Sequence, residues 1–370
     1  MKRILVTGGA GFIGSHLADE LLQHGYRVRA LDNLSVQVHG PARKRPGYLN
    51  PDVELLVGDI RDPDAVRKSL NGVDAVYHFV SIVGVGQSMY ELVRYTDVNN
   101  LGTAVLLEAL IKRPVERLIV ASSMSIYGEG LYRAPDGSVH SAVDRTLEQL
   151  RRSDWEMRGP SGEPLTPVPT PEWKAPSIAS VYALSKYDQE RLCLMIGQAY
   201  GISAVAMRLF NAYGPNQALS NPYTGVLAIF ASRLLNNKPP IIFEDGCQLR
   251  DFVSVRDVAR ACRRALEVPA AAGHVFNVGS GVQYRVADIA RRMARILGKN
   301  IEPEISGKYR VGDIRHCFPD ISLASRVLGY KPEVALEDGL LDLAAWLDGQ
   351  IVEDRFVEAK QELAARGLVV

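Results

Sequence analysis

Two short segments place residues that could together move a proton on a hydroxyl group. In YALSK, Tyr182 and Lys186 stand four residues apart, so a helix would put both side chains on one face. A free tyrosine titrates at about 10, whereas a general base works best near the operating pH, and the Lys186 ammonium could supply much of the required lowering of the pKa. Ser123 ends a predicted strand, where its hydroxyl could bond a substrate hydroxyl. Taken alone, Tyr182 and Lys186 could also be exposed polar residues of an ordinary helix.

A glycine-rich segment near the start of the chain, VTGGAGFIG at 6–14, predicts a nucleotide-binding turn. It lies between an apolar run typical of a strand and a run with helical spacing, and in that context the glycines permit a tight turn, close approach to a pyrophosphate and helix packing. The first turn of the helix would hold the phosphates through its free N–H groups. An ordinary tight turn is the alternative. The predicted contacts are Gly8, Gly11, Phe12, Ile13 and Gly14.

Acidic residues follow the next two predicted strands. Asp32 stands eighteen residues after the last glycine of the turn, where its carboxylate could accept hydrogen bonds from both ribose hydroxyls of an adenosine. A 2′-phosphate would meet that negative charge, so NAD is predicted rather than NADP, with Lys186 on its nicotinamide ribose. Asn33, Asp59 and Ile60 complete this part of the site. Asp32 could instead be a turn residue, and Asp59 could equally cap the following helix.

Composition excludes several classes of partner. The chain of 370 residues carries 43 basic and 42 acidic residues, so no overall charge recruits nucleic acid or an anionic membrane. The apolar runs are too short to span a bilayer, and the first residues lack the apolar length of a signal peptide. The four cysteines stand far apart with no C-x-x-C pair, which predicts neither a metal site nor a disulfide framework and favours a reducing cytoplasm.

Strand and helix patterns alternate along the first 215 residues. Such alternation predicts a Rossmann-type, doubly wound α/β fold with a parallel sheet. After 215 it loosens, which predicts a smaller C-terminal α/β substrate lobe over 216–370, with some segments returning to the first domain; PIIFED and HVFNVG are strand-like pieces there. Strands are expected at 3–7, 26–31, 53–57, 73–78, 115–121 and 202–208, and helices at 12–24 and 180–200.

Residues 131–176 form an insertion of a different kind. Six prolines lie within 160–176. Proline removes a backbone donor and restricts its neighbours, so we expect a lid without regular structure.

The chain resembles the extended short-chain dehydrogenase/reductase family, in particular its nucleotide-sugar epimerases, over roughly residues 1–345. The resemblance implies that Asn99 supports the active site, that Ser123, Tyr182 and Lys186 are catalytic, and that Asn211, Arg250 and Arg315 bind a substrate diphosphate. The motifs that carry it are TGGAGFIG at 7–14, NNLGT at 99–103, SSMSIYG at 122–128, YALSK at 182–186, RLFNAYGP at 208–215, GCQLRDF at 246–252 and GDIRH at 312–316.

The reaction class depends on the two residues after the catalytic serine. In the dehydratases that the chain resembles, an Asp-Glu pair stands there, and a glutamate lies nearby in the decarboxylases; here Met124 and Ser125 cannot ionise usefully at neutral pH. The reductases use a Cys and a His and favour NADP, whereas this chain has Ser123 and Asp32. The resemblance therefore implies 4-epimerisation through a transient 4-keto sugar with bound NAD. Small residues at 83–88, Gly84 among them, would line the sugar pocket or be plain loop residues.

The substrate and the assembly are expectations from the same resemblance. SSMSIYGEGLYR and the insertion resemble the dTDP-L-rhamnose 4-epimerases, which interconvert dTDP-L-rhamnose and dTDP-6-deoxy-L-talose; UDP-glucose or UDP-glucuronate is the alternative. Helical segments near 92–112 and 182–200 carry extra apolar positions, so a homodimer through a four-helix bundle is implied. A non-catalytic NAD-binding regulator or scaffold on the same fold is the alternative of another class.

Overall fold

The computed structural model describes residues 2–141, 144–221, 223, 225–310, 312–350, 354 and 356–369. Its centre is a seven-stranded parallel sheet in the order β14-β9-β5-β4-β1-β2-β3, which confirms the predicted α/β class. The strands are β1 (Arg3–Thr7), β2 (Arg27–Asp32), β3 (Glu54–Val57), β4 (Ala75–His78), β5 (Arg117–Ser123), β9 (Ser203–Leu209) and β14 (Val275–Val278).

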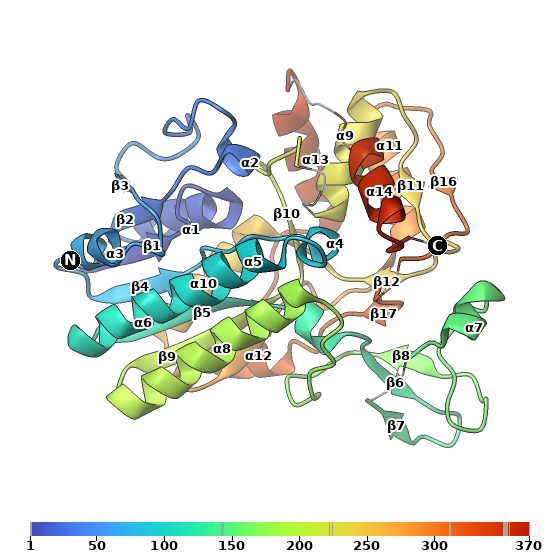
Figure 1. The fold of residues 1–370 in the computed structure, drawn as a ribbon, viewed down its shortest axis with the longest axis horizontal. Helices are drawn as coiled ribbons and strands as arrows, with labels where there is room; N and C mark the ends of the chain where they lie inside the picture. Colours follow the sequence, from blue (N-terminus) through green and yellow to red (C-terminus); the bar gives the residue numbers. More distant parts are fainter. Residues whose placement is uncertain are drawn as a thin grey trace.

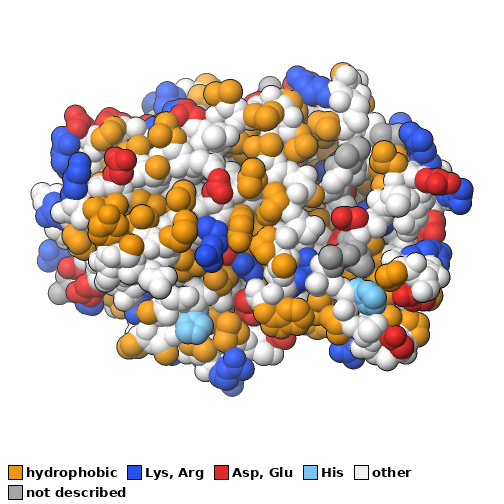
Figure 2. All heavy atoms as spheres, turned by 60° about the horizontal axis from the view of Figure 1, so that its bottom comes forward, with side chains coloured by type: hydrophobic (Ala, Val, Ile, Leu, Met, Phe, Trp, Pro, Cys, Tyr) orange, Lys and Arg blue, Asp and Glu red, His pale blue; other side chains and the backbone are white. Residues whose placement is uncertain are grey.

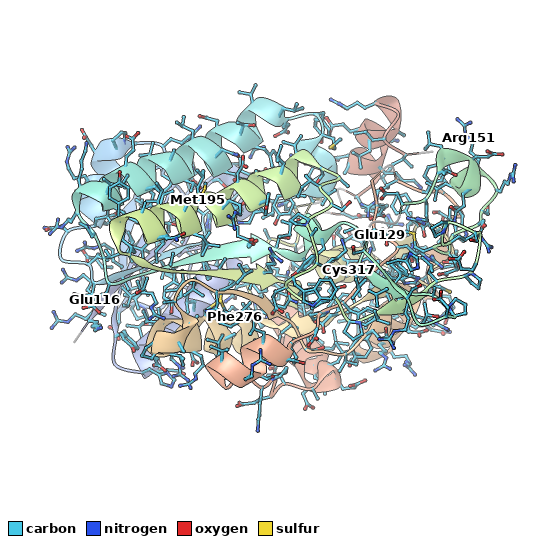
Figure 3. The ribbon with its side chains drawn as sticks, turned by 90° about the horizontal axis from the view of Figure 1, so that it is seen from below. Glu116, Glu129, Arg151, Met195, Phe276 and Cys317 are labelled. Atoms are coloured by element: carbon cyan, nitrogen blue, oxygen red, sulfur yellow. The ribbon has the colours of Figure 1, made fainter. Side chains whose placement is uncertain are left out.

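Alternating side chains of each strand supply the two faces of the sheet. On β1, Ile4 and Val6 belong to one buried cluster and Leu5 to the other, as the two-residue period of a strand requires. The first cluster is covered by α1 (Phe12–Gln23), α10 (Val255–Glu267) and α12 (Ser322–Leu328), and the second by α3 (Pro63–Ser69), α6 (Gly102–Lys112) and α8 (Val181–Tyr200). Figure 3 shows the sheet between these two helical layers.

The order of the strands fixes where a ligand can bind. The chain builds β1, β2 and β3 outward in one direction and then returns to place β4 on the other side of β1. Ligands of such sheets bind at the carboxyl ends of the strands next to this reversal. The ends of β1, β4 and β5 therefore define the candidate site.

A smaller lobe follows β9. Its core is formed by α9 (Val226–Leu235), α11 (Val286–Ile296) and α13 (Leu336–Leu347). HVFNVG does not belong to this lobe: it forms β14, which pairs with β9 at the edge of the main sheet, because its apolar residues pack into the main core. Short strands pair around these helices: β10 (Asn211–Tyr213) with β13 (Phe252–Ser254), β11 (Ile241–Ile242) with β16 (Glu304–Ile305), and β15 (Tyr284–Arg285), β12 (Leu249–Arg250) and β17 (His316–Cys317).

The insertion has regular structure, so the expectation of an irregular lid is wrong. β6 (Leu131–Arg133) pairs antiparallel with β7 (Val139–His140) and β8 (Thr166–Val168), and α7 (Leu147–Arg151) lies between them in the sequence. Pro167 lies on an edge strand, where a missing donor costs no ladder bond. A small apolar cluster stabilises the unit, which projects at the lower right of Figure 1: Tyr132, Ala134, Met157 and Leu165.

The remaining described elements are short, except for the last helix. They are α2 (Val36–His39), α4 (Val85–Ser88), α5 (Leu92–Tyr95), a π-helical turn η1 (Thr96–Leu101), the 3₁₀ turns η2 (Met124–Tyr127) and η3 (Pro269–Ala271), and α14 (Phe356–Ala365). Among the described residues, no helix combines the length and the apolar character needed to cross a membrane.

Candidate active site

The glycine turn joins β1 to α1 as the sequence predicts. Gly8 has a φ of +70°, and a Cβ on Gly14 would lie 2.3 Å from the carbonyl oxygen of Gly8, so both positions require glycine. Gly11 is the N-cap of α1, which has neither a side-chain cap nor an acidic residue in its first turn. The positive end of the helix is therefore free to bind phosphate.

Phe12 and Ile13 open the first turn of α1. The Ile13 side chain packs against the main core, and the Phe12 ring meets His16 edge-on. The side chains of Phe12 and Ile13 therefore pack against other side chains. A ligand can contact these two residues through their backbone N–H groups in the first turn of the helix.

Asp32 is held against this turn. Its carboxylate accepts hydrogen bonds from the backbone N–H groups of Ala10 at 3.1 Å and Leu34 at 2.9 Å. A carboxylate has about four acceptor positions, so it can still accept from ribose hydroxyls. His39 stands beside it, with Nε2 3.7 Å from Oδ1. The turn and Asp32 together fit an adenosine diphosphate group.

Asn33 and Asp59 come together at the ends of β2 and β3. Asn33 Nδ2 donates to Asp59 Oδ2 at 3.0 Å, and the hydrogen bonds from Arg61 hold the pKa of Asp59 well below its usual range. Asp62, not Asp59, caps α3, which removes the capping alternative. Ile60 is buried against Gly102.

Asn99 lies in the π-helical turn and is fully buried. Its Oδ1 accepts from the Ile82 N–H at 2.8 Å, and its Nδ2 donates to the Ile82 carbonyl and to Ser185 Oγ. It therefore ties the loop after β4 to the helix that carries Tyr182 and Lys186. Both of its donors are used, so its contribution is to position that helix.

Ser123 and Tyr182 meet at the end of β5. A side-chain hydrogen bond from Ser123 lowers the pKa of Tyr182, but burial has the larger effect and raises it overall. Ser123 Oγ also accepts from the backbone N–H and the hydroxyl of Ser125, at 3.1 and 2.9 Å. The backbone N–H of Tyr182 donates to Ser88 Oγ at 3.0 Å, which fixes the start of α8 against the loop after β4.

Lys186 does not have the expected partner. Its Nζ donates to Gln189 Oε1 at 2.7 Å, and burial lowers its pKa to about 7. The pKa of Tyr182 is raised, with no contribution from Lys186. The lowering of the tyrosine pKa by the lysine therefore stays a prediction, because in this arrangement the Lys186 ammonium bonds Gln189.

Gln189 continues inward from Lys186, in a chain of buried polar groups that the sequence analysis missed. Its Nε2 donates to Thr103 Oγ1 at 3.0 Å and lies 3.2 Å from His78 Nε2, and His78 Nδ1 lies 3.0 Å from Thr7 Oγ1. Burial lowers the pKa of His78 to about 3. The i+3 spacing of Gln189 from Lys186 was the available signal. The chain connects the catalytic helix to the residue that precedes Gly8.

Gly84 lies at the predicted sugar pocket. It is buried with a φ of +129°, and a Cβ there would lie 2.8 Å from Tyr223 Cβ. The glycine is needed for close approach of the tyrosine, so it is more than a plain loop residue. Asn211, on β10, donates through Nδ2 to the Asp251 carbonyl at 2.7 Å.

The two arginines that are predicted to bind the diphosphate, Arg250 and Arg315, differ in their partners. Arg250 donates to the carbonyls of Leu249, Ile314 and Arg315, and it forms no ion pair among the described residues, although its charge acts on the Asp313 carboxylate. Arg315 is fully buried. We therefore leave it out of the substrate site, because its charge is already neutralised by three carboxylates: Glu156, Glu244 and Asp245.

Arg310 is a second arginine near Arg250, and its guanidinium is already paired with Asp313. It is half-exposed and stacks on the Phe243 ring. Burial acts to raise the pKa of Asp313, but the charges of Arg310 and Arg250 hold it below its usual range. Both cations therefore face one carboxylate. The position of Arg310, two residues before Gly312 in GDIRH, was the sequence signal.

A cavity of about 540 Å³ lies elsewhere, between the insertion and the smaller lobe. Glu156, Cys247, Tyr284 and His316 are among the residues that line it, and none of its lining residues is a predicted site residue. Figure 3 shows Glu129 and Cys317 at this junction, where the Gly130 N–H donates to the His316 carbonyl.

Comparison with known proteins shows the family to which the chain belongs. Residues 4–147 and 156–279 match the NAD dependent epimerase/dehydratase family. The chain is 37% identical to a dTDP-L-rhamnose 4-epimerase of Burkholderia thailandensis, over 94% of this chain and 95% of that protein. It is 33% identical to a putative UDP-glucose 4-epimerase of Methanocaldococcus jannaschii, over 93% and 98%. The fold is similar to a UDP-glucuronic acid 4-epimerase of Bacillus cereus with UDP-glucuronic acid and NAD, with TM-score 0.75, 30% identity and coverage of 94% and 99%.

Proposed function

Since the chain belongs to the NAD dependent epimerase/dehydratase family, whose relatives here are NAD-dependent nucleotide-sugar 4-epimerases, we propose that it interconverts dTDP-L-rhamnose and dTDP-6-deoxy-L-talose. The observation that carries the reaction class is the Ser123 and Tyr182 pair at the end of β5, followed in η2 by Met124 and Ser125. Neither of these provides the carboxylate that dehydration or decarboxylation would need. The Burkholderia relative supports the choice of sugar.

The chemistry assigned to this chain's own residues is proton transfer. As the phenolate, Tyr182 takes the proton from O4 of the sugar, while Ser123 bonds the same O4 and stabilises the charge that develops there. Bound NAD supplies the hydride acceptor at C4 and the source of the returned hydride. After the ring turns over, Tyr182 gives the proton back to O4, so no net oxidation occurs.

The nucleotide end must stay fixed while the sugar turns. Arg250 supplies a guanidinium that forms no ion pair among the described residues, and Asn211, on β10, donates to the carbonyl of Asp251, the residue after Arg250. We assign these two side chains, with Arg310 beside them, to the substrate diphosphate. Gly84 and the loop after β4 are assigned to the sugar.

The alternative substrates are UDP-glucose and UDP-glucuronate. The Methanocaldococcus and Bacillus relatives favour them, because their names and bound molecules carry UDP-sugars. A non-catalytic scaffold is a weaker candidate, since Ser123 and Tyr182 are in contact and such a role needs neither.

We further propose a homodimer in the cytoplasm. Apolar side chains are exposed along α5, η1 and α8, and Figure 2 shows hydrophobic groups on this side of the molecule, while Figure 3 shows Met195 on the outer side of α8. A second copy could cover them by two-fold symmetry. Sedimentation at micromolar concentration tests this, and a monomer would contradict it. The exposed residues include Leu92, Val93, Leu101, Leu184, Met195 and Tyr200.

The decisive experiment is incubation of the protein, without added cofactor, with a panel of dTDP- and UDP-sugars. Proton NMR of the C4 configuration should show a mixture of C4 epimers from a dTDP-6-deoxyhexose. In deuterium oxide the product should keep protium at C4, because the hydride returns to the same carbon. Deuterium at C5 would indicate a dehydratase-like or 3,5-epimerase step, and conversion of UDP-sugars alone would favour the alternative substrates.

A further inference from the structure

The last helix, α14, packs on the loop that we assign to the sugar. A Cβ on Gly86 would lie 3.1 Å from Leu363 Cδ2, so the Leu363 side chain packs directly on the backbone at Gly86. Leu363 is buried although it lies near the end of the chain. Figure 1 shows α14 beside the turn that α4 makes after β4. This contact adds residues beyond 345 to the surroundings of the proposed site.

Glu362, one residue earlier, joins two tyrosines from different parts of the fold. Its Oε2 accepts hydrogen bonds from the hydroxyls of Tyr90 at 3.1 Å and Tyr223 at 3.2 Å, and the two phenolic oxygens lie 2.5 Å apart. Arg366 pairs with Glu362 Oε1 at 3.2 Å and stacks on the Tyr90 ring at 4.2 Å. Three side chains, Tyr90, Tyr223 and Arg366, thus contact one carboxylate.

Tyr223 connects Glu362 to the proposed sugar pocket, because it packs against Gly84. Its Cβ leaves no room for a side chain at Gly84. The hydroxyl of Tyr95 donates to the carbonyls of Val83 and Gly84, at 2.8 and 3.0 Å, and the Tyr95 ring meets the Tyr182 ring edge-on. A continuous series of contacts therefore runs from α14 to the proton-transferring tyrosine.

The end of the same segment reaches the proposed diphosphate end. Val369 forms an isolated antiparallel bridge with Arg310. Residues 356–369 consequently contact both the loop assigned to the sugar and an arginine beside Arg250. A segment that only stabilised the smaller lobe would not need to touch both.

We infer that Glu362 is a positioning residue for the sugar end of the site, holding Tyr90 and Tyr223 against the loop of residues 83–88 so that α14 forms the outer wall of the sugar pocket. The inference rests on the proposed nucleotide-sugar epimerase function. Its physical basis is that one carboxylate can accept from two hydroxyls at once, whereas the tyrosines alone have no shared anchor. The wall must be fixed because the sugar turns within it.

The test compares Glu362→Ala with Glu362→Gln in the purified full-length enzyme. Alanine removes the acceptor, so we expect KM for the nucleotide sugar to rise about tenfold, while the inhibition constant of the free nucleoside diphosphate changes less than about twofold. Glutamine keeps an acceptor oxygen and should restore most of the loss. Gln361→Ala, an exposed neighbour on α14, is the matched control and should behave as wild type.

Two outcomes overturn the inference. Equal weakening of the nucleotide sugar and the free nucleoside diphosphate would mean a general structural role for Glu362, and an unchanged KM in Glu362→Ala would mean no role at the site. Tyr223→Phe removes one of the two donors and serves if the alanine variant does not fold; an unchanged KM there also counts against the inference. If the wild-type enzyme epimerises no nucleotide sugar, the proposed function itself is wrong. That outcome differs from a failure of the inference about Glu362, which is judged on variants of an active enzyme.

Discussion

The ammonium of Lys186 lies 2.7 Å from the amide oxygen of Gln189, and the same amide lies 3.2 Å from the imidazole of His78. All three side chains are buried. The buried lysine therefore has a neutral partner in place of a carboxylate, and burial, which outweighs the opposing charge of Glu190, lowers its pKa to about 7. Its protonation state is thus poised near neutral pH and depends on residue 189.

This relationship predicts opposite pH shifts in two variants. If the prediction that protonated Lys186 stabilises the Tyr182 phenolate is right, the alkaline fall of kcat that reports deprotonation of Lys186 should begin near pH 7 in the wild-type enzyme. Gln189→Glu places a negative charge beside Lys186, raises its pKa and should move the fall to higher pH by about one unit or more. Gln189→Leu removes the acceptor and should move it to lower pH. Shifts in the same direction in both variants would contradict this account.

Tyr182→Phe should remove turnover and leave the cofactor site intact. The change deletes the proton acceptor but keeps the ring that packs edge-on against Tyr95. General acid–base groups contribute roughly 100- to 10,000-fold, so kcat should fall by that range. The NAD content of the purified variant, measured after denaturation, should match wild type. A rate within tenfold of wild type would exclude Tyr182 from proton transfer.

The sequence predicts the elements better than it predicts the partners of charged side chains. The strands β1 to β5 and β9 were foreseen within about two residues, because apolar runs between glycines and helical spacing depend on local pattern alone. The acidic partners of Arg315 come from positions 156, 244 and 245, which are distant in the chain, so no local pattern could show that its charge is already neutralised. The neutral partner of Lys186 could not be predicted for a related reason, because spacing puts Tyr182 and Lys186 on one face but does not say which way a flexible side chain turns.

In the insertion, the sequence pattern predicted too little regular structure. Its prolines suggested irregular structure, yet Pro167 fits an edge strand beside Tyr132. Proline excludes a central strand but not an edge strand, and only the pairing with β6 settles which applies. HVFNVG likewise has the pattern of a strand, and its place at the edge of the main sheet depends on tertiary pairing with β9.

Asp32→Asn should weaken the preference for NAD over NADP. The carboxylate lies at the glycine turn, bonded to the N–H groups of Ala10 and Leu34, and would repel a 2′-phosphate. Asparagine keeps one acceptor oxygen and removes the charge. The dissociation constant for NADP divided by that for NAD should therefore fall by about tenfold, or 1.4 kcal/mol. Titration of the cofactor-free protein with each dinucleotide measures it. Tighter binding of NADP than NAD by the wild-type protein would mean that Asp32 is not at the ribose.

Arg250→Met and Arg315→Met should separate binding from stability. Arg250 forms no ion pair among the described residues but donates to three backbone carbonyls, so its loss should raise KM for the nucleotide sugar by about tenfold or more and lower the free energy of unfolding by only about 1 kcal/mol. Arg315 is fully buried and pairs with Glu156, Glu244 and Asp245, so its loss removes a buried positive charge from three carboxylates. Glu244 is buried but keeps Arg145 as a partner. Breaking a fully buried ion pair costs about 3 to 5 kcal/mol, so we expect a loss of folding stability of about 3 kcal/mol here. Denaturant unfolding and steady-state kinetics on the two purified variants measure both effects. If Arg315→Met instead raised KM at unchanged stability, Arg315 would belong to the diphosphate site, and its carboxylate partners would have to release it when substrate binds.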